Sequence, residues 1–232
     1  MQKHLKLISE GLLHLLYPQL CLGCNVPLKG NEELLCLECA IKIPETGFHH
    51  ILENDAWKRF VGRVSIERAT SLAHFTNEGL LQVLIHALKY SSNKKVGIYL
   101  GELLGRRLLK AGWDVDVVIP VPLHKKKEAK RGYNQSLYIA TGICNVTNWE
   151  LDNKHLVRTK ETESQTQKSR KARVDNMKGA FEVLPANYAN TTKFLLIDDV
   201  LTTGSTLEAC VLALNRHNYS KISIATIGIA VS

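Results

Sequence analysis

Long apolar runs are absent from this sequence of 232 residues. No stretch reaches the roughly 18 consecutive apolar residues of a membrane-spanning helix, so we expect a soluble, cytoplasmic protein that is not embedded in a membrane. Aromatic residues make up only 6%, which weakens, without excluding, any function that depends on stacking many nucleobases. Two nucleotide-binding fingerprints are also missing: no G-x-G-x-x-G occurs, and no lysine follows the glycine of the hydroxyl-rich segment around residue 204.

The first eighteen residues resemble a targeting segment only in part. Ser9, Glu10 and His14 interrupt the apolar residues, and no small-residue cleavage site follows. Leucine and isoleucine recur at spacings of three, four and seven, which predicts an amphipathic helix ending at Pro18. We expect this helix to pack on the rest of the chain, with docking on a membrane or a partner as the alternative.

Four of the six cysteines form two C-x2-C pairs, "CLGC" and "CLEC", with eleven residues between them. The four are Cys21, Cys24, Cys36 and Cys39. Because each pair offers two thiolates from one tight turn, the spacing predicts a closed, structural Zn2+ site. An iron–sulfur cluster and disulfide bonds are the alternatives, and a cytosolic chain disfavours the second. We expect a small zinc-ribbon-like module within residues 1–45 and a connection over residues 46–66.

Residues 67–232 alternate between apolar strands and amphipathic helices. This alternation, at βαβ lengths, predicts an α/β fold with a mainly parallel sheet and helices on both faces. We predict strands over 70–75, 116–122, 155–158, 179–184, 193–199 and 221–230, and helices over 78–90, 96–112, 132–144 and 205–218.

The stretch "LLIDDVLTTG" ends the most apolar of these strands with two neighbouring acids, Asp198 and Asp199. Placing a carboxylate at a buried strand costs several kcal/mol unless a partner or ligand compensates. Ligands of parallel sheets bind beyond the carboxyl ends of the strands. The pair therefore predicts a site for sugar hydroxyls, bound directly or through a divalent ion; acids that merely cap nearby amides are the alternative.

A hydroxyl-rich loop follows the acids and leads into a predicted helix. Its hydroxyls and backbone N–H groups surround a glycine that permits close approach, so the helix dipole and the N–H groups can hold a phosphate. We also expect Ser205 or Thr206 to cap the helix. The loop consists of Thr202, Thr203, Gly204, Ser205 and Thr206.

The net charge of +8 is concentrated in two stretches, 124–132 and 154–178. Such charge runs are commonly solvated faces. Beside a phosphate site they are also consistent with a surface for the phosphates of a small molecule or of a nucleic acid.

The motif "FLLIDDVLTTGST" resembles the phosphoribosyl pyrophosphate (PRPP) motif of type I phosphoribosyltransferases. In chain order, "YPQLCLGC", "CLEC", "VPLHKKKEAKRGYNQS", "LVRTKETESQTQKSRKARVDNMKGAF" and this motif resemble the ComF family of ComFC/GntX-like competence proteins. The resemblance implies a zinc module joined to a type I phosphoribosyltransferase-like domain, linked in many bacteria to DNA uptake during natural transformation. The segment from Trp57 to Arg68, between the two parts, matches no known motif.

The resemblance also implies roles for single residues. Asp198 and Asp199 would hold the ribose and Thr202 to Thr206 its 5-phosphate, with Mg2+ accompanying the diphosphate. The loop that follows the 116–122 strand would contact the diphosphate through Leu123, His124, Lys125, Lys126 and Arg131, with Asn134 and Gln135 nearby. A mobile loop over 158–176 would cover the site and carries the matching positions Arg158, Gln165, Arg173 and Asn176.

The expected activity is transfer of a phosphoribosyl group to an acceptor that the sequence does not identify. The alternative is a non-catalytic factor of transformation that binds PRPP or single-stranded DNA and contacts proteins of the competence machinery. For base stacking, Tyr133 beside Arg131 is one candidate.

Overall fold

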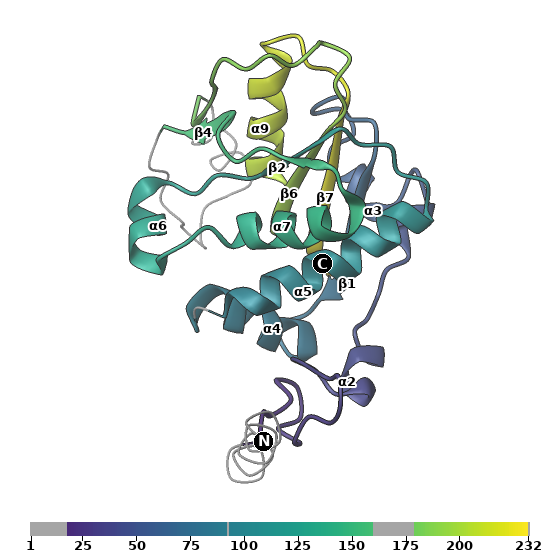
Figure 1. Cartoon of the computed structure of the whole chain (residues 1–232). Coiled ribbons are helices and arrows are strands. Elements are labelled where there is room, and N and C mark those ends of the chain that lie inside the picture. The colour runs from purple at the N-terminus through teal and green to yellow at the C-terminus, as the bar shows by residue number, and fades with distance from the viewer. Residues whose placement is uncertain (1–17, 92, 160–178, 232) are drawn as a thin grey trace, which may run out of the picture.

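The computed structural model describes residues 18–91, 93–159 and 179–231. A five-stranded sheet forms its centre, in the order β1–β7–β6–β2–β3, and every neighbouring pair of strands is parallel (Figure 1). The central strands are apolar and buried on both faces, as expected where helices cover both sides of a sheet. The strands are β1 (Ala69–Phe75), β2 (Val117–Pro120), β3 (Glu150–Leu151), β6 (Phe194–Leu201) and β7 (Ile222–Ala230).

Helices cover both faces of this sheet. Along β6, Leu195 and Ile197 belong to the hydrophobic core shared with α4, α5 and α7, whereas Phe194 and Leu196 belong to the core on the side of α9. The predicted mainly parallel α/β fold is therefore confirmed. The four helices are α4 (Leu80–Tyr90), α5 (Lys94–Lys110), α7 (Gln135–Thr147) and α9 (Ser205–Asn215).

Helices α5 and α7 approach each other closely because glycines face the contact. A Cβ atom on Gly101 would lie 2.1 Å from the carbonyl oxygen of Ile139, and one on Gly142 would lie 2.1 Å from that of Ile98. Only residues without a side chain let two helix backbones come this near. The glycines thus set how α7 lies against α5, and α7 in turn contacts β6 and β2.

The strands predicted over 155–158 and 179–184 are present as β4 (Leu156–Arg158) and β5 (Phe181–Val183), but they pair antiparallel in a separate two-stranded sheet instead of joining the parallel one. Several short helices were not predicted. The basic stretch after β2, expected as a loop, forms the seven-residue helix α6 (Lys125–Arg131). The remaining short helices are α2 (Leu37–Ile41), the 3-10 helix η1 (Phe48–His50) and α3 (Asp55–Lys58).

The cysteine-containing segment lies below α4 at the N-terminal end of the described chain (Figure 1). Its apolar residues Leu34, Leu35 and Ile43 belong to the same hydrophobic core as α4 and α5. A Cβ atom on Gly23 would lie 2.7 Å from Leu80 Cδ1, so the first cysteine turn rests directly on the start of α4. The helix predicted over residues 1–18 falls almost wholly outside the described residues.

Within the described ranges, no helix combines the length and the apolar character needed to cross a bilayer.

Candidate functional site

Asp198 and Asp199 lie inside β6, which continues to Leu201 rather than ending at the acids. Asp198 Oδ1 accepts a hydrogen bond from Ser136 Oγ at 3.1 Å, and Asp199 Oδ2 accepts one from Gln135 Nε2 at 3.1 Å. Both partners stand at the beginning of α7, so this helix start contacts both carboxylates. Gln135 was expected near the site, and its contact with Asp199 is consistent with that expectation.

Lys89 is a site residue that sequence reasoning missed. It lies near the end of α4, and its Nζ is 2.8 Å from Asp199 Oδ2. The side chains of the two residues are only 23% and 9% exposed. The motif offers no hint of this ion pair, because the two residues are far apart in sequence and meet only when α4 packs against the sheet.

The two acids share a partly dehydrated environment. Burial, followed by the charge of Asp199, raises the pKa of Asp198 to about 7, while the N–H of Asp199, Lys89 and the Ser136 hydroxyl act in the opposite direction. Carboxylate oxygens suit Mg2+, which proteins usually bind through one or two carboxylates together with substrate phosphates. The oxygen atoms of the acid pair are therefore chemically suited to a Mg2+ ion.

The hydroxyl-rich loop turns directly from β6 into α9. Gly204 has the left-handed φ of 76° and precedes the first residue of the helix, Ser205. The prediction that Ser205 or Thr206 caps α9 is wrong, since the N-cap is Gly204 and no side chain caps the helix. The first N–H groups of a helix have no intrahelical partner, and an uncapped end can offer them to an anion.

The segment from Trp57 to Arg68, which matches no motif, contacts this loop. Arg59 donates to the carbonyl oxygen of Thr202 at 2.8 Å, and Arg63 donates to that of Thr203 at 2.8 Å and also pairs with Glu208. Sequence reasoning missed both arginines. Because the arginines bind backbone carbonyl groups, this segment restrains the conformation of the loop.

The fit between this segment and the loop is close at Gly204. The ring of Phe60 is fully buried and would lie 3.0 Å from a Cβ atom placed on Gly204. A side chain at this position would therefore meet both an unfavourable φ and an aromatic ring.

The predicted diphosphate loop is only partly a loop. Leu123 and His124 precede α6, and Nδ1 of His124 accepts from the N–H of Lys126 at 3.3 Å, so His124 acts as the helix cap. Lys125 and Lys126 are exposed on α6, and Arg131 at its end stacks over the ring of Tyr90 with 5.8 Å between Cζ and ring centroid. Since Tyr90 follows Lys89, the end of α6 lies beside the end of α4 that reaches the acids.

Arg158 and Arg173 were expected on the covering loop. Arg158 ends β4, where its guanidinium lies 5.4 Å from the ring centroid of Phe181. Burial lowers the pKa of Arg158, whereas the charges of Cys210 and Asp198 act in the opposite direction, so this cation stands near the acid pair. Arg173, with Gln165 and Asn176, lies outside the described residues.

Two neighbours of the basic helix have structural partners. Asn134 caps α7 and donates through Nδ2 to the carbonyl oxygen of Val121 at 3.0 Å. Tyr133 is only 6% exposed, and its hydroxyl donates to the carbonyl oxygen of Leu88. The expectation that Tyr133 stacks bases is therefore wrong, because packing against α4 buries it. Tyr90, 68% exposed, is the accessible aromatic at this edge.

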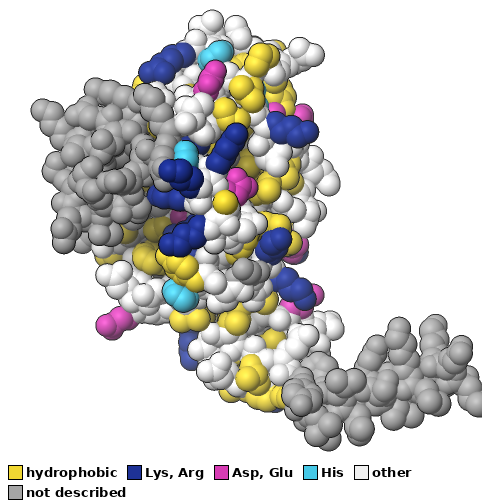
Figure 2. All heavy atoms as spheres, turned by 90° about the vertical axis from the view of Figure 1, so that its left-hand side faces the viewer, with side chains coloured by type: hydrophobic (Ala, Val, Ile, Leu, Met, Phe, Trp, Pro, Cys, Tyr) yellow, Lys and Arg dark blue, Asp and Glu magenta, His cyan; other side chains and the backbone are white. Residues whose placement is uncertain are grey.

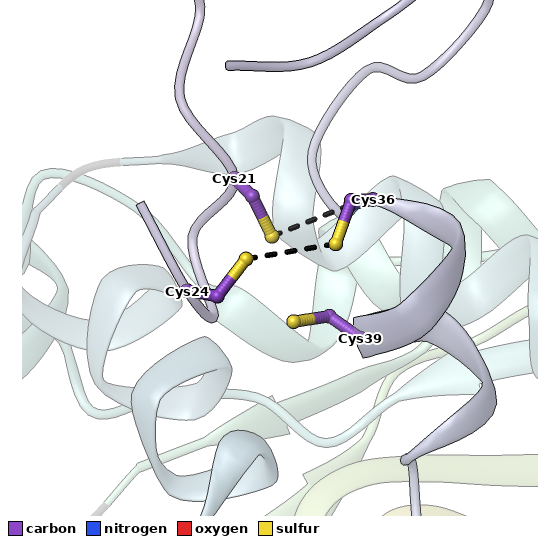
Figure 3. Close-up of side chains that lie close together, drawn as sticks. All are labelled: Cys21, Cys24, Cys36 and Cys39. Atoms are coloured by element: carbon purple, nitrogen blue, oxygen red, sulfur yellow. Dashed lines mark hydrogen bonds between the residues drawn. The ribbon is translucent and has the colours of Figure 1, made fainter. Parts of the chain in front are cut away.

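The four clustered cysteines form a separate candidate metal centre. Figure 3 shows their sulfur atoms pointing to a common centre, and all four Sγ atoms lie within 4.8 Å of one another. The distance of 3.6 Å between Cys24 Sγ and Cys36 Sγ is close to the edge of about 3.8 Å of a tetrahedron with the usual Zn–S bond. The cluster therefore fits one tetrahedral metal ion.

Backbone N–H groups favour the thiolate form of one cysteine of this cluster. Sγ of Cys21 accepts N–H bonds from Gly23 at 3.4 Å and Cys36 at 3.3 Å. Burial raises the pKa of Cys21, but the N–H groups of Cys36, Cys24 and Gly23 outweigh it, so the pKa lies below its ordinary value. The thiolate of Cys21 is thus favoured, as metal binding requires, whereas burial and the neighbouring thiols raise the pKa of Cys39.

Three curated relatives match this chain over most of its length. It is 26% identical over 211 residues to the DNA utilization protein YhgH of Salmonella typhi, covering 88% of this chain and 82% of the relative. It is 26% identical over 232 residues to YhgH of Escherichia coli K12, covering 89% of this chain and 95% of that relative. It is 26% identical over 228 residues to competence protein F of Haemophilus influenzae, covering 93% of this chain and 92% of that relative.

The chain is a homologue of YhgH and of competence protein F. The resemblance to the ComF family is thereby confirmed. No protein-family model matches this chain.

Solved structures similar to this chain include two enzymes. One is an allosteric regulatory enzyme of purine biosynthesis, with a TM-score of 0.42 and 16% identity over 61% of this chain and 29% of that one. Another is a hypoxanthine phosphoribosyltransferase from Staphylococcus aureus, with a TM-score of 0.35 and 14% identity over 57% of this chain and 62% of that one. The chain thus spans less than a third of the first enzyme.

Proposed function

We propose that this chain binds PRPP together with Mg2+ at the carboxyl end of β6, and that it acts in the handling of DNA during natural transformation. The names of its relatives, DNA utilization protein and competence protein F, support the second part. The observation that carries the first part is the adjacency of two acids to an uncapped helix start. A ribose phosphate has matching groups, with hydroxyls for Asp198 and Asp199 and a phosphate for the N–H groups around Gly204.

Different groups of residues around the site would bind different parts of the ligand. The loop Thr202–Thr206 would hold the 5-phosphate with its hydroxyls and N–H groups, and the acids would orient the ribose. Lys125, Lys126 and Arg131 would face the diphosphate, whose charge Mg2+ would partly neutralise. Transfer would displace the diphosphate from C1 of the ribose, and such a step depends mainly on positioning and charge stabilisation.

Thermal unfolding tests the binding. With Mg2+ present, PRPP at about 100 times its Kd should raise the Tm of the full chain by about 5 °C or more. Mg2+ alone should not reproduce the shift. Asp199→Asn should abolish it, because the neutral amide loses the charge that orients hydroxyls and metal, whereas Asp114→Asn, an exposed residue paired with Lys193, should keep it. A wild-type protein whose Tm does not respond to PRPP would contradict the proposal.

Release of diphosphate tests transfer. The full chain is incubated with PRPP, Mg2+ and a panel of nucleobases, amines and nucleic acids, and diphosphate is measured. Acceptor-dependent release that Asp199→Asn abolishes would establish a phosphoribosyltransferase. Binding of PRPP without release for every acceptor would favour the non-catalytic alternative.

The basic helix α6 favours direct binding of single-stranded DNA as a second function. Figure 2 shows Lys and Arg side chains gathered on the face that carries α6. Four lysines and one arginine stand against one glutamate in this helix. Replacing Lys125, Lys126 and Lys127 by Gln should weaken DNA binding. The slope of log K against log salt concentration should become shallower by about 0.7 for each phosphate contact that is lost. Replacing Lys29 and Lys42, in the cysteine-containing segment, should change neither.

We also propose that the four cysteines bind one Zn2+ ion in a closed, structural site. The all-thiolate ligand set and the tetrahedral spacing of the sulfur atoms support zinc. The cytosolic location expected from the sequence argues against disulfide bonds between these cysteines.

A further inference from the structure

Lys89 reaches the acid pair from a helix that the motif does not contain. Its ammonium nitrogen is 2.8 Å from Asp199 Oδ2, with both side chains largely shielded from water. An ion pair of this kind is not a solvated surface contact, whose contribution is usually small. Its position makes Lys89 a direct neighbour of any ligand that Asp199 binds.

The hydrogen bonds of Asp199 are nearly saturated. Its Oδ1 accepts from the N–H of Val200 at 2.7 Å, and its Oδ2 accepts from Gln135 and contacts Lys89. A carboxylate has about four acceptor positions, so three of them are in use. A divalent cation that binds Asp199 Oδ2 must therefore compete with the Lys89 ammonium for the same oxygen.

The charges of the acid pair also favour contact with the Lys89 ammonium. Asp198 and Asp199 are sequence neighbours, and two carboxylates so close together repel each other. Lys89 counteracts this repulsion, since its charge favours the ionised form of Asp198 as well. An ammonium has three N–H donors, and a long, flexible stem lets it turn from a carboxylate to another oxygen atom.

We propose that Lys89 is a ligand-binding residue that controls how the metal enters the site. In the free protein it occupies Asp199 and keeps a divalent cation from binding alone. When the metal arrives with a diphosphate, Lys89 gives up this oxygen and donates to the anionic oxygens of the ligand. Asp199 would thus become available to a metal only when the diphosphate ester is also bound. This inference rests on the proposed PRPP site.

Two affinities with opposite expected changes test it. Mn2+, used as a probe for Mg2+, is titrated alone into the full zinc-loaded chain and followed by electron paramagnetic resonance. Mg2+-PRPP binding is measured by calorimetry. In Lys89→Met, Mn2+ alone should bind about 10-fold more tightly and Mg2+-PRPP about 10-fold more weakly, the size expected for one charged hydrogen bond. A merely structural role for Lys89 would not raise either affinity.

Three variants serve as controls. Lys95→Met removes the same charge from the exposed side of α5 and should leave both affinities unchanged. Lys89→Arg retains the charge and should keep Mn2+ binding weak. Adding Asp199→Asn to Lys89→Met should cancel the gain in Mn2+ affinity, because the competing oxygen is then no longer charged.

The outcomes separate this inference from the proposed function. If wild type binds Mg2+-PRPP and Lys89→Met behaves like Lys95→Met, only the role of Lys89 is overturned. The same holds if Lys89→Met binds both Mn2+ and Mg2+-PRPP more weakly and also has a lower Tm. If wild type does not bind Mg2+-PRPP at all, the proposed function fails, and the exchange of partners by Lys89 fails with it.

Discussion

Asp198 has a raised pKa because several groups around it act against its negative charge. Burial contributes most and the adjacent Asp199 second, while Lys89, Ser136 and the N–H of Asp199 only partly offset them. The charge of Asp198 in turn acts to raise the pKa of Arg158, against the larger effect of burial. A ligand or metal that supplies positive charge or hydroxyl donors would stabilise the ionised carboxylates. The electrostatic cost of burying these charges in the free site would therefore be offset when the ligand binds.

This raised pKa predicts a pH-dependent stability. The unfolded carboxyl loses its proton near pH 3.8 and the folded one near pH 7, so the native state holds an extra proton between these values. The free energy of unfolding should therefore fall as pH rises through this window.

Asp198→Asn provides the comparison, because the amide does not titrate. Between pH 5 and pH 7.5, wild type should lose about 2 kcal/mol of stability relative to this variant, as measured by urea unfolding at several pH values. Equal pH profiles for the two proteins would contradict the assignment. Titrations of groups far from Asp198 are common to both proteins and cancel in the difference.

At the scale of elements, the segment between the cysteines and the sheet supports the ligand loop. Arg59 and Arg63 hold loop carbonyl groups, and Arg63 also forms a largely buried pair with Glu208 of α9. A buried pair is costly to break on one side only. We infer that this connection stabilises the loop and the start of α9 in one conformation before any ligand arrives.

The contact between α5 and α7 carries a second prediction. In Gly101→Ala the new methyl group would overlap the backbone carbonyl of Ile139, so the helices must separate. We expect a loss of about 3 kcal/mol or more, at the upper end of overpacking effects, measured by chemical unfolding. Weaker PRPP binding should accompany it, because α7 positions Gln135 and Ser136 against the acids.

Gly97→Ala is the matched control on the same helix. Its added methyl group would lie 2.9 Å from Tyr138 Cβ and 3.0 Å from Leu88 Cδ1, and the nearest backbone atom, Ile139 N, is 3.5 Å away. Since this backbone distance compares with 2.1 Å at Gly101, the loss should be smaller. An equal loss in both variants would show that the close backbone contact at Gly101 is not the cause.

At the scale of the whole molecule, the cysteine module and the sheet domain share one hydrophobic core. Leu34, Leu35 and Ile43 pack with residues of α4 and α5, and Gly23 rests on Leu80 at the start of α4. The other end of α4 carries Lys89. A change in the module can therefore reach the candidate site through a single helix.

Metal removal tests this continuity. The protein purified under reducing conditions should contain one zinc per chain by plasma mass spectrometry, and chelation should increase hydrogen exchange over residues 18–45 and at the start of α4. The reason is that metal binding provides much of the folding energy of such a module. Cys24→Ser should lose zinc, whereas Cys144→Ser, outside the cluster, should retain it. Protein that contains no zinc would contradict the assignment.

Local chemistry alone was enough to predict much of this protein. The two C-x2-C pairs, the apolar strand before Asp198 and the loop around Gly204 are patterns of neighbouring residues, and the structure places each as a unit. The alternation of strands and helices determined the fold class, because hydrophobic periodicity is a local property of the chain.

Only the tertiary structure decided which distant residues complete the site. Lys89, Arg59 and Arg63 come from segments without a motif, and they reach the acids and the loop because α4 and the connection pack there. Packing likewise buried Tyr133 and left Tyr90 exposed. Such contacts depend on how helices lie on the sheet, which is set by core shape and close glycine contacts, and no short stretch of sequence encodes that geometry.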